Sequence, residues 1–213
     1  MTQQSDFDPQ IVLDLWFPDN GHWTSPETHM AFWRERMQGG MDARIIRDFA
    51  ELTHAAAAGA LDHWAETPRG RLALLIALDQ FPRSLWRDTP GAFGQDIKAT
   101  RLALDGIENG HFHALPHIWE RQFYLIAISH CEGPDHLDRL DVKDRMVEGY
   151  PEICPPGMEP MLEKLAEQHA REREIIERFG RHPHRNPIYG RVSTPEEEAY
   201  IATGDFPHVK STD

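Results

Sequence analysis

Four short segments hold the side chains most able to do chemistry, because each places carboxylate, guanidinium or imidazole groups beside apolar residues. The first is LDQFPR, at residues 78–83, which contains Asp79 and Arg83. Asp79 lies one turn beyond the apolar stripe of its helix, so we expect it to be semi-buried and to need a cationic or hydrogen-bonding partner. It is therefore either half of a structural ion pair or a carboxylate of a functional site.

The second and third segments lie on one expected helix, over residues 116–131. Glu120 and Arg121 are adjacent in sequence, so they sit about 100° apart and flank the aromatic stripe rather than pair with each other. They can cover the core with their stems, or join a site if both point into one groove. In the SHCE sequence that ends this helix, His130 can be a hydrogen-bonded core histidine or a proton carrier, with Glu132 as a candidate base.

The fourth segment, FGRHPHRNP at residues 179–187, is the densest in polar groups. Its two prolines restrict the backbone and predict extended geometry at His182 and Asn186. Alternate side chains of an extended chain share a side, which predicts two sets that face opposite ways: His182, His184 and Asn186 on one side, Arg181 and Arg185 on the other. A stiff loop with five polar groups is costly to order unless neighbours or a ligand satisfy them.

The imidazoles of this segment do not by themselves make a metal site. His182 and His184 supply two ligands, whereas zinc sites use three or four, so neither a metal nor another cofactor is predicted. Thr194 is expected to cap a further helix, whose first N–H groups could face an anion. Glu196 and Glu197 already occupy that positive end of the helix dipole.

Helices are the elements that must position these segments. A small polar residue precedes proline and an apolar-periodic stretch at five places, which is typical of helix starts: Asp8, Ser25, Thr67, Thr89 and Thr194. We expect helices over residues 9–17, 26–38, 42–58, 68–81, 92–109, 116–131, 135–149, 158–179 and 195–203. β-branched residues nowhere alternate with polar ones for more than a few positions, so no sheet is predicted. The fold class is all-α, with antiparallel helix pairs stacked on one another.

Size and composition bound the architecture. The chain has 213 residues, of which 40% are hydrophobic and 27% charged, values typical of a globular protein. We expect one helical domain over residues 1–204 and a loose tail over residues 205–213. The longest apolar run, residues 72–78, is far too short to span a bilayer, so no membrane partner is expected.

Charge and cysteine content restrict partners and compartment. The net charge of −13 argues against nonspecific binding of nucleic acid, which is itself a polyanion. Of the 22 basic residues 18 are arginine, whose planar fork suits paired carboxylates and bound anions. The sequence starts without a secretory signal, and its two cysteines cannot form a disulfide framework. We therefore expect a cytoplasmic location.

Several motifs follow one another along nearly the whole chain: VLDLWF at residues 12–17, LDQFPR, TPGAF at 89–93, the Glu120-Arg121 pair with its aromatic successors, SHCE, and FGRHPHRN followed by GRVSTPEEE. In this order they resemble a bacterial family catalogued as domain of unknown function 924. The resemblance implies a tetratricopeptide-like α/α superhelix with no established activity. The chain departs from the family pattern at Ser84 and Cys131, where Asn and Ser are usual, so a catalytic hydroxyl at 131 is not implied.

Three functions are compatible with these residues, and whether the protein is an enzyme stays open. The first is a pocket for a small anionic ligand, with binding residues Arg83, Arg121, Arg181, His182, His184, Arg185 and Asn186. Its candidate catalytic residues would be His130, Glu132, Asp79 and Glu120. The second is an interaction scaffold for a protein partner or a second copy, in which the motifs form a structural polar network. The third is a metal-assisted hydrolase that uses His130, Glu132, His182 and His184.

Overall fold

One helix runs through the centre of the molecule, which a computed structural model describes over residues 7–204. This helix, α5 (Pro68–Asp79), starts at the expected place, where the Thr67 side chain accepts the N–H of Gly70. Every residue from Gly70 to Asp79 is buried, so the expectation of a single inner face on this helix is wrong. A helix that is apolar all round must be covered on all sides. Helices α1 (Pro9–Trp16), α4 (Ala50–Ala57), α7 (Asp96–Glu108) and α9 (Ile118–His130) pack against it.

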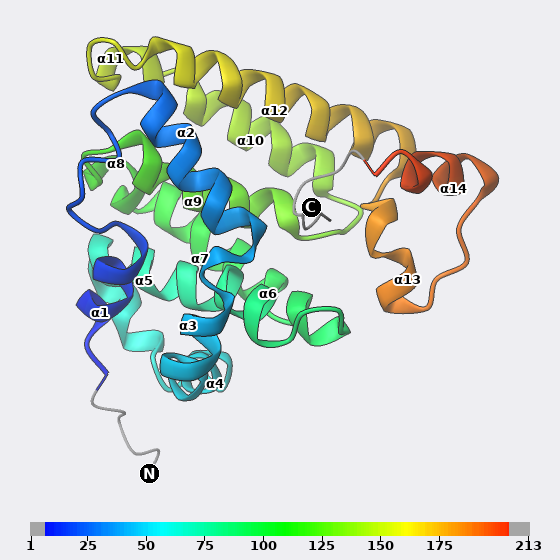
Figure 1. Cartoon of the computed structure of the whole chain (residues 1–213), viewed down its shortest axis with the longest axis horizontal. Helices are drawn as coiled ribbons and strands as arrows, with labels where there is room; N and C mark the ends of the chain where they lie inside the picture. Colours follow the sequence, from blue (N-terminus) through cyan, green and yellow to red (C-terminus); the bar gives the residue numbers. More distant parts are fainter. Residues whose placement is uncertain (1–6, 205–213) are drawn as a thin grey trace.

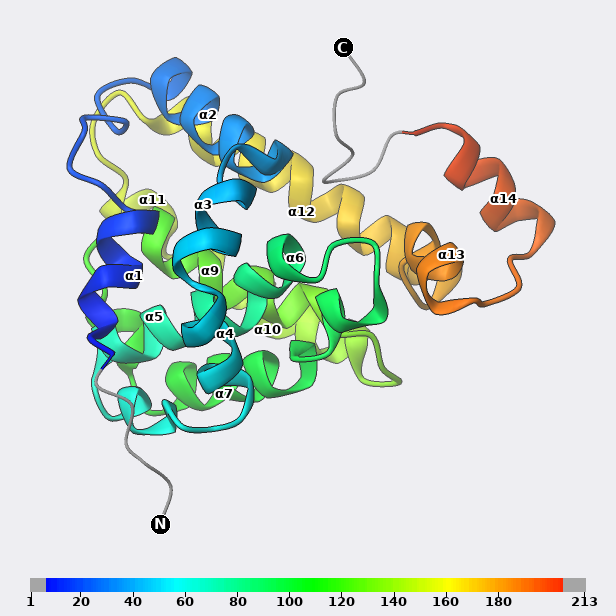
Figure 2. The same cartoon turned by 60° about the horizontal axis from the view of Figure 1, so that its bottom comes forward.

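The remaining helices complete an all-α fold, and residues 7–204 contain no strand. They are α2 (Pro26–Glu35), α3 (Asp42–Asp48), α6 (Phe81–Leu85), α8 (His111–Ala114), α10 (His136–Val147), α11 (Tyr150–Ile153), α12 (Glu159–Phe179), α13 (Asn186–Tyr189) and α14 (Pro195–Ala202). Figures 1 and 2 show α12 lying along one face of the bundle and α13 and α14 forming an arm beyond its end. The stacking of these helices as a tetratricopeptide-like superhelix stays a prediction, as does their organisation into one domain.

Most helix starts are confirmed at the level of the capping hydrogen bond. The side chains of Asp8, Ser25, Thr67 and Thr194 each accept a backbone N–H of the first turn. Thr89 is the exception, because its hydroxyl donates to the carbonyl of Trp86 and only a 3₁₀ turn follows, over Pro90–Phe93.

Several expected helix boundaries are wrong by two or more residues, for example those at 26–38, 116–131 and 135–149, where the helices are Pro26–Glu35, Ile118–His130 and His136–Val147. Three further differences have a clear local cause. The helix expected at residues 92–109 begins only at Asp96, after the 3₁₀ turn. The helix expected at 42–58 is two helices, α3 and α4, with Phe49 at the junction in a non-helical conformation. The helix expected at 68–81 ends at Asp79, and Phe81 begins α6 with Pro82 in its first turn, where proline needs no N–H partner.

The side chains of the helices form one large apolar core and a small second cluster. The second cluster contains Leu140, Ile175 and Ile176, with Phe179 and Tyr200 packed against them, and it joins α10, α12 and α14. No helix in the described part of the chain is long and apolar enough to cross a membrane. The expected C-terminal tail, residues 205–213, lies outside the described residues.

Helices α7 and α9 pack side by side beneath a buried arginine, and Gly106 lies at this contact. A Cβ atom at Gly106 would come within 2.6 Å of both Arg71 Cδ and Tyr124 Cε1. The Arg71 side chain is already committed there, because its guanidinium donates to the carbonyls of Ala65 and Leu102. The position therefore has no room for a side chain.

We expect Gly106→Ala to lower the free energy of unfolding by about 1–3 kcal/mol, measured by urea denaturation followed by circular dichroism. Helix propensity alone predicts the opposite sign, because alanine is the better helix former by about 1 kcal/mol. The control is Gly149→Ala, where φ is −81° and no atom lies within 4 Å of the new Cβ. If Gly106→Ala is as stable as this control, the close approach does not constrain the fold.

Candidate functional site

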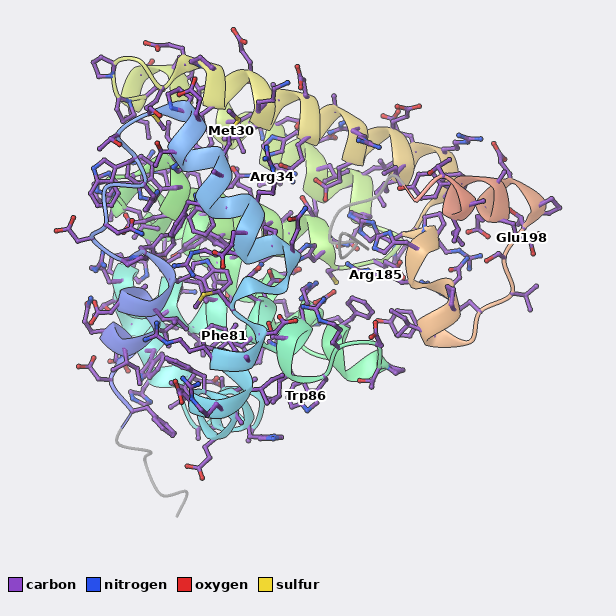
Figure 3. The ribbon with its side chains drawn as sticks, in the orientation of Figure 1. Met30, Arg34, Phe81, Trp86, Arg185 and Glu198 are labelled. Atoms are coloured by element: carbon purple, nitrogen blue, oxygen red, sulfur yellow. The ribbon has the colours of Figure 1, made fainter. Side chains whose placement is uncertain are left out.

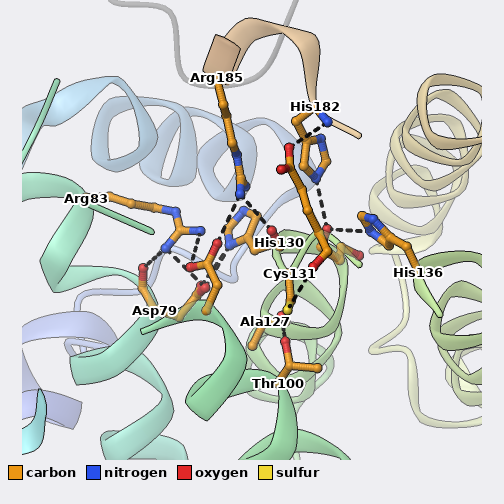
Figure 4. A network of polar contacts seen from close by, with 12 residues as sticks. Asp79, Arg83, Thr100, Ala127, His130, Cys131, His136, His182 and Arg185 are labelled. Carbon is orange, nitrogen blue, oxygen red and sulfur yellow. Dashed lines mark hydrogen bonds and ion pairs between the residues drawn. The ribbon is translucent and has the colours of Figure 1, made fainter. Parts of the chain in front are cut away.

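Five charged or titratable side chains meet where α5, α6, α7, α9 and the segment before α13 come together. We call these residues, Asp79, Arg83, Asp96, His130 and Arg185, the Asp96 cluster. Asp79, Arg83, His130 and Arg185 are labelled in Figure 4. Arg83 bridges the two carboxylates, with Nη1 3.2 Å from Asp79 Oδ1 and Nη2 2.9 Å from Asp96 Oδ1. Arg185 extends the chain of ion pairs, with Nη1 3.1 Å from Asp96 Oδ2. Segments that lie up to 106 residues apart in sequence, from position 79 to 185, therefore share one ion-pair network.

His130 is oriented by the carboxylate of Asp79. Its Nδ1 lies 2.8 Å from Asp79 Oδ1 and 3.1 Å from Oδ2, and Gln80 Nε2 donates to Asp79 Oδ2 at 2.5 Å. Because a carboxylate only accepts, Nδ1 carries a hydrogen and Nε2 is the acceptor nitrogen of the neutral ring. Asp79 is 1% exposed, whereas 12% of the His130 side chain reaches the surface. This is the arrangement of an imidazole held in one tautomer and able to exchange a proton.

Arg185 is held on one edge of its guanidinium and unengaged on the other. Nη1 donates to Asp96 Oδ2 and, at 2.8 Å, to the carbonyl of His130, and the guanidinium lies 4.3 Å from the centre of the Phe93 ring. Nε is buried without a partner, and the Nε–Nη2 edge donates to no residue of the described chain. Burial, together with the nearby Arg83, lowers the pKa of Arg185. Figure 3 shows the side chain reaching from the C-terminal arm back toward the bundle.

Glu132, a candidate base, is committed to structural hydrogen bonds. Arg191 donates to it at 2.6 and 3.2 Å, and the backbone N–H of His182 donates at 2.8 Å. Burial alone would raise the pKa of Glu132, but these donors outweigh it and hold the pKa below its usual value. Both oxygens therefore serve to tie the segment after α12 to the end of α9.

His136 and His182 both donate through Nε2 to the carbonyl of Ser129, at 2.9 and 3.1 Å. Burial is the main cause that lowers the pKa of His136 to about 4 and the pKa of His182 well below its usual value. Both rings are neutral donors to the end of a helix, where carbonyls have no partner within the helix. His182 is placed here as a structural donor, and its ring centre lies 5.5 Å from that of His184.

The expected geometry of the FGRHPHRNP segment is wrong beyond its first residues. His182 is extended, at φ −89° and ψ 100°, but Asn186 is helical, at φ −56° and ψ −46°. Pro183 and Pro187 each stand in the first turn of a short helix, over Pro183–Arg185 and α13, where proline is tolerated. Alternate side chains therefore do not share a side.

The two arginines of this segment therefore make contacts in different parts of the molecule. Arg185 turns inward to Asp96, whereas Arg181 forms a bidentate pair with Glu197 at 2.6 and 2.8 Å. Asn186 is fully buried and donates to Ser193 Oγ at 3.0 Å. Glu197 also closes a capping box with Thr194, so the start of α14 is satisfied within the protein.

Glu120 and Arg121 do not join the Asp96 cluster. They lie in the first turn of α9, roughly 15 Å along the helix axis from His130 at 1.5 Å per residue. Glu120 pairs with Arg69 at 2.9 Å, and Arg121 donates to the carbonyls of Leu115 and His113 at 2.8 and 2.9 Å. Glu120 and Arg121 therefore do not share a centre with Arg83, Arg185 and His130, although the sequence analysis placed them in one candidate pocket.

The described residues give no support to a metal centre or a reactive thiol. No group of three or more His, Cys, Asp and Glu residues within 7–204 could hold a metal ion. Cys131 and Cys154 are both free thiols, and burial raises the pKa of each. The four residues expected for a metal-assisted hydrolase, His130, Glu132, His182 and His184, therefore do not gather into a metal-binding group in this part of the chain.

The sequence analysis did not single out several residues on which the site depends. Asp96 and Phe93 hold the arginines of the cluster, and Arg139 donates to the carbonyls of Ile128 and Cys131 at 2.8 and 2.7 Å. Phe93 and Arg191 lie within the TPGAF and GRVSTPEEE motifs, and this is the signal by which the sequence could have identified them. Asp96 looks in sequence like an ordinary first-turn acid of a helix, and only the tertiary contacts show its burial.

Comparison with known proteins gives two matches. The family model described as bacterial protein of unknown function (DUF924) matches residues 12–205. The solved structure of a protein of unknown function from Agrobacterium tumefaciens is similar, with a TM-score of 0.67 and 28% sequence identity, over 92% of this chain and 97% of that one. No curated protein matches the chain. These similarities agree with the all-α fold and carry no activity with them.

We expect Asp96→Asn to lower the free energy of unfolding by about 3–5 kcal/mol, because it leaves two buried guanidinium groups without their shared carboxylate. Chemical denaturation followed by circular dichroism measures the change. Asp105→Asn, at an exposed position of the same helix, is the matched control and should shift stability by less than about 0.5 kcal/mol. Equal stability of the two variants would contradict the role of Asp96.

Stability should fall as pH drops from about 6.5 to 4. In the unfolded chain His136 has a pKa near 6.5, and in the folded protein its pKa is about 4, so between these values the unfolded state binds more protons. At about 1.4 kcal/mol per pH unit, His136 alone can contribute up to about 3 kcal/mol to this loss, and His182 acts with the same sign. Urea unfolding at successive pH values should show a shallower dependence for His136→Gln. The same substitution at exposed His63 should leave the slope unchanged.

Proposed function

This chain belongs to the bacterial family of proteins of unknown function DUF924, and we propose that it binds a small oxyanion at the Nε–Nη2 edge of Arg185. The observation that carries the proposal is the one-sided engagement of this guanidinium, which is 3% exposed and whose buried Nε has no acceptor. A buried donor without an acceptor costs about 1–3 kcal/mol, and a ligand oxygen would recover that free energy. The parallel N–H groups of this edge match a carboxylate or phosphate group.

The protein supports this edge before any ligand arrives. Asp96 and the His130 carbonyl hold the opposite edge of the guanidinium, and the Phe93 ring packs against its plane. An arginine whose rotamer is already locked loses little side-chain entropy on binding. The Arg185 guanidinium therefore offers a positive charge in a fixed orientation, whereas a mobile surface arginine offers the charge without the orientation.

Charge balance couples the binding of an oxyanion to the protonation of His130. The carboxylates of Asp79 and Asp96 offset the guanidinium groups of Arg83 and Arg185, so the cluster is neutral when His130 is neutral. A bound oxyanion adds a negative charge, and protonation of His130 restores neutrality. Because Asp79 accepts from Nδ1, it would stabilise the charged imidazole. We therefore expect the protein to take up a proton as it binds the ligand.

The other arginines of the sequence motifs restrict the size of the anionic group. Arg181 and Arg191 are paired with Glu197 and Glu132, and Arg121 is bonded to carbonyls at the far end of α9. Arg185 would therefore act as a single fork, which suits one carboxylate or phosphate group rather than a polyanion.

The pairs of Arg181 and Arg191 also favour a second role for the motifs. Each joins the segment after α12 to an acidic residue, and their charges are neutralised within the protein. In this alternative the motifs are a structural network that positions the C-terminal arm. Under it, substitution at Arg185 would alter stability without altering any anion affinity.

Calorimetric titration with inorganic phosphate, acetate and succinate tests the proposal. We expect saturable binding of at least one probe and a loss of about tenfold or more in affinity, 1.4 kcal/mol, for Arg185→Lys, which keeps the charge and removes the fork. Arg101→Lys, at an exposed position of α7, is the matched control and should bind like the unchanged protein.

Proton uptake is read from the same titration in two buffers of different ionisation enthalpy. The apparent binding enthalpy should differ between the buffers for the unchanged protein and not for His130→Gln. Equal affinity of Arg185→Lys and the unchanged protein, or no binding of any probe at millimolar concentration, would overturn the proposal. Thermal unfolding of each variant without ligand separates lost binding from lost folding.

A further inference from the structure

A second group of polar and aromatic side chains lies at α2, apart from the Asp96 cluster. Its members are His22, His29, Phe32, Trp33 and Arg36, and we call them the His22 cluster. The His22 ring stacks on Phe32 at 4.2 Å and 5°, and the Arg36 guanidinium lies 4.1 Å from the centre of the same ring. None of these residues takes part in the site proposed above.

The hydrogen bonds of the cluster fix the tautomer of each imidazole. Trp33 Nε1, which can only donate, lies 3.1 Å from His29 Nε2, so that nitrogen is an acceptor. Burial lowers the pKa of His22 and of His29 to about 4, so both rings are neutral at pH 7. His29 therefore carries its hydrogen on Nδ1 and donates it to His22 Nδ1, 3.1 Å away.

These tautomers determine the state of the other ring nitrogen of His22, Nε2. Since its Nδ1 accepts, the neutral His22 ring must carry its hydrogen on Nε2, and this N–H has no hydrogen-bond partner. The residue is 1% exposed, so solvent does not satisfy the group. The hydrogen bond from Trp33 thus sets the tautomers of His29 and His22, and it leaves the buried Nε2–H of His22 without an acceptor.

Arg36 adds two more unsatisfied donors beside the Phe32 ring on which His22 stacks. Its Nε and Nη1 are buried and have no partner, and burial is the main cause that lowers its pKa. The residue begins a turn over Arg36–Gly40, in which Gly39 is left-handed at φ 93° and the chain kinks between α2 and α3. Gly40 permits this turn, because a Cβ there would lie 2.8 Å from the backbone carbonyl oxygen of Glu35. His22 and Arg36 both lie against the Phe32 ring, so their unsatisfied donors belong to one part of the molecule.

The walls around these donors are aromatic. Trp23, Phe32 and Trp33 are half-buried, and Trp23 stacks on Trp119 with 6.1 Å between ring centres and 9° between planes. Trp119 also contacts the His22 ring edge-on at 5.8 Å. Partly exposed, parallel aromatic planes offer stacking area to a flat ring, while the buried N–H groups offer hydrogen bonds to an anion.

We infer that the His22 cluster binds the carboxylate of a small aromatic molecule, with Arg36 and the Nε2–H of His22 as donors and the tryptophans as stacking partners. A carboxylate has lone pairs for several donors at once and neutralises the charge of Arg36. The aromatic part distinguishes this ligand from the simple oxyanion expected at Arg185. The two sites are independent.

Titration of intrinsic tryptophan fluorescence with phenylacetate tests the inference, because Trp23, Trp33 and Trp119 all belong to the site. We expect saturable binding with a dissociation constant of about 1 mM or below. Phenylacetamide, which has the same shape and no charge, should bind at least about tenfold more weakly. Equal binding of the amide, or no saturable change with phenylacetate, would overturn the inference.

Variants assign the binding to this cluster. Arg36→Gln should weaken phenylacetate binding about tenfold or more, whereas Arg34→Gln, at an exposed position of the same helix, should not change it. Arg34 is labelled beside Met30 in Figure 3. Arg185→Lys should also leave phenylacetate binding unchanged, which separates this site from the one proposed above. Loss of binding in Arg34→Gln or Arg185→Lys to the same extent as in Arg36→Gln would contradict the assignment.

A measurement on the unchanged protein does not depend on the folding of any variant. Long-range proton–nitrogen NMR spectra of the imidazoles should show hydrogen on Nε2 of His22 and on Nδ1 of His29, and phenylacetate should shift the His22 Nε2–H resonance. The opposite tautomers, or a His22 resonance unmoved at saturating phenylacetate, would overturn the inference.

Discussion

The end of helix α9 is the constraint on which the site depends. A helix terminus leaves its last carbonyls without partners inside the helix, and this terminus is buried. Side chains from elsewhere in the chain donate to all four consecutive carbonyls: Arg139 to Ile128 and Cys131, His136 and His182 to Ser129, and Arg185 to His130. Helix α10 and the segment after α12 are thereby docked on the end of one helix.

This docking brings the candidate chemistry to the same place. The residue whose carbonyl Arg185 satisfies is His130, and the imidazole of that residue lies against Asp79. A cation at a helix C-terminus is also favoured by the helix dipole, so Arg185 is stabilised where its charge would otherwise be costly to bury. A ligand that moves Arg185 would act on the end of α9 directly, because the same Nη1 atom bonds the carbonyl and Asp96.

Several arginines of this protein donate to main-chain carbonyls, whereas others pair with carboxylates. Arg71, Arg121 and Arg139 each donate to two main-chain carbonyls, and all of these carbonyls except that of Leu102 lie at helix ends or turns. Arg36, Arg185 and Arg191 keep buried donors without acceptors. Glu132 engages both Nη atoms of Arg191, whereas no residue of the described chain engages both Nη atoms of Arg36 or of Arg185. That contrast, more than the number of arginines, separates the two candidate binding positions from the structural network.

Local residue patterns were sufficient for the all-α fold and for most helix starts, because a cap at Asp8 or Thr194 and the proline after it act within one turn. They failed at Thr89 and Phe49, where packing decides whether a turn continues into a helix. Asp79, as a buried carboxylate that needs a partner, could be inferred from its place on α5, but its partners could not. The roles of Asp96, Arg185 and His22 rest on contacts between distant segments, and no periodicity records which donor reaches which acceptor. Burial and pairing of that kind arise only when the helices pack.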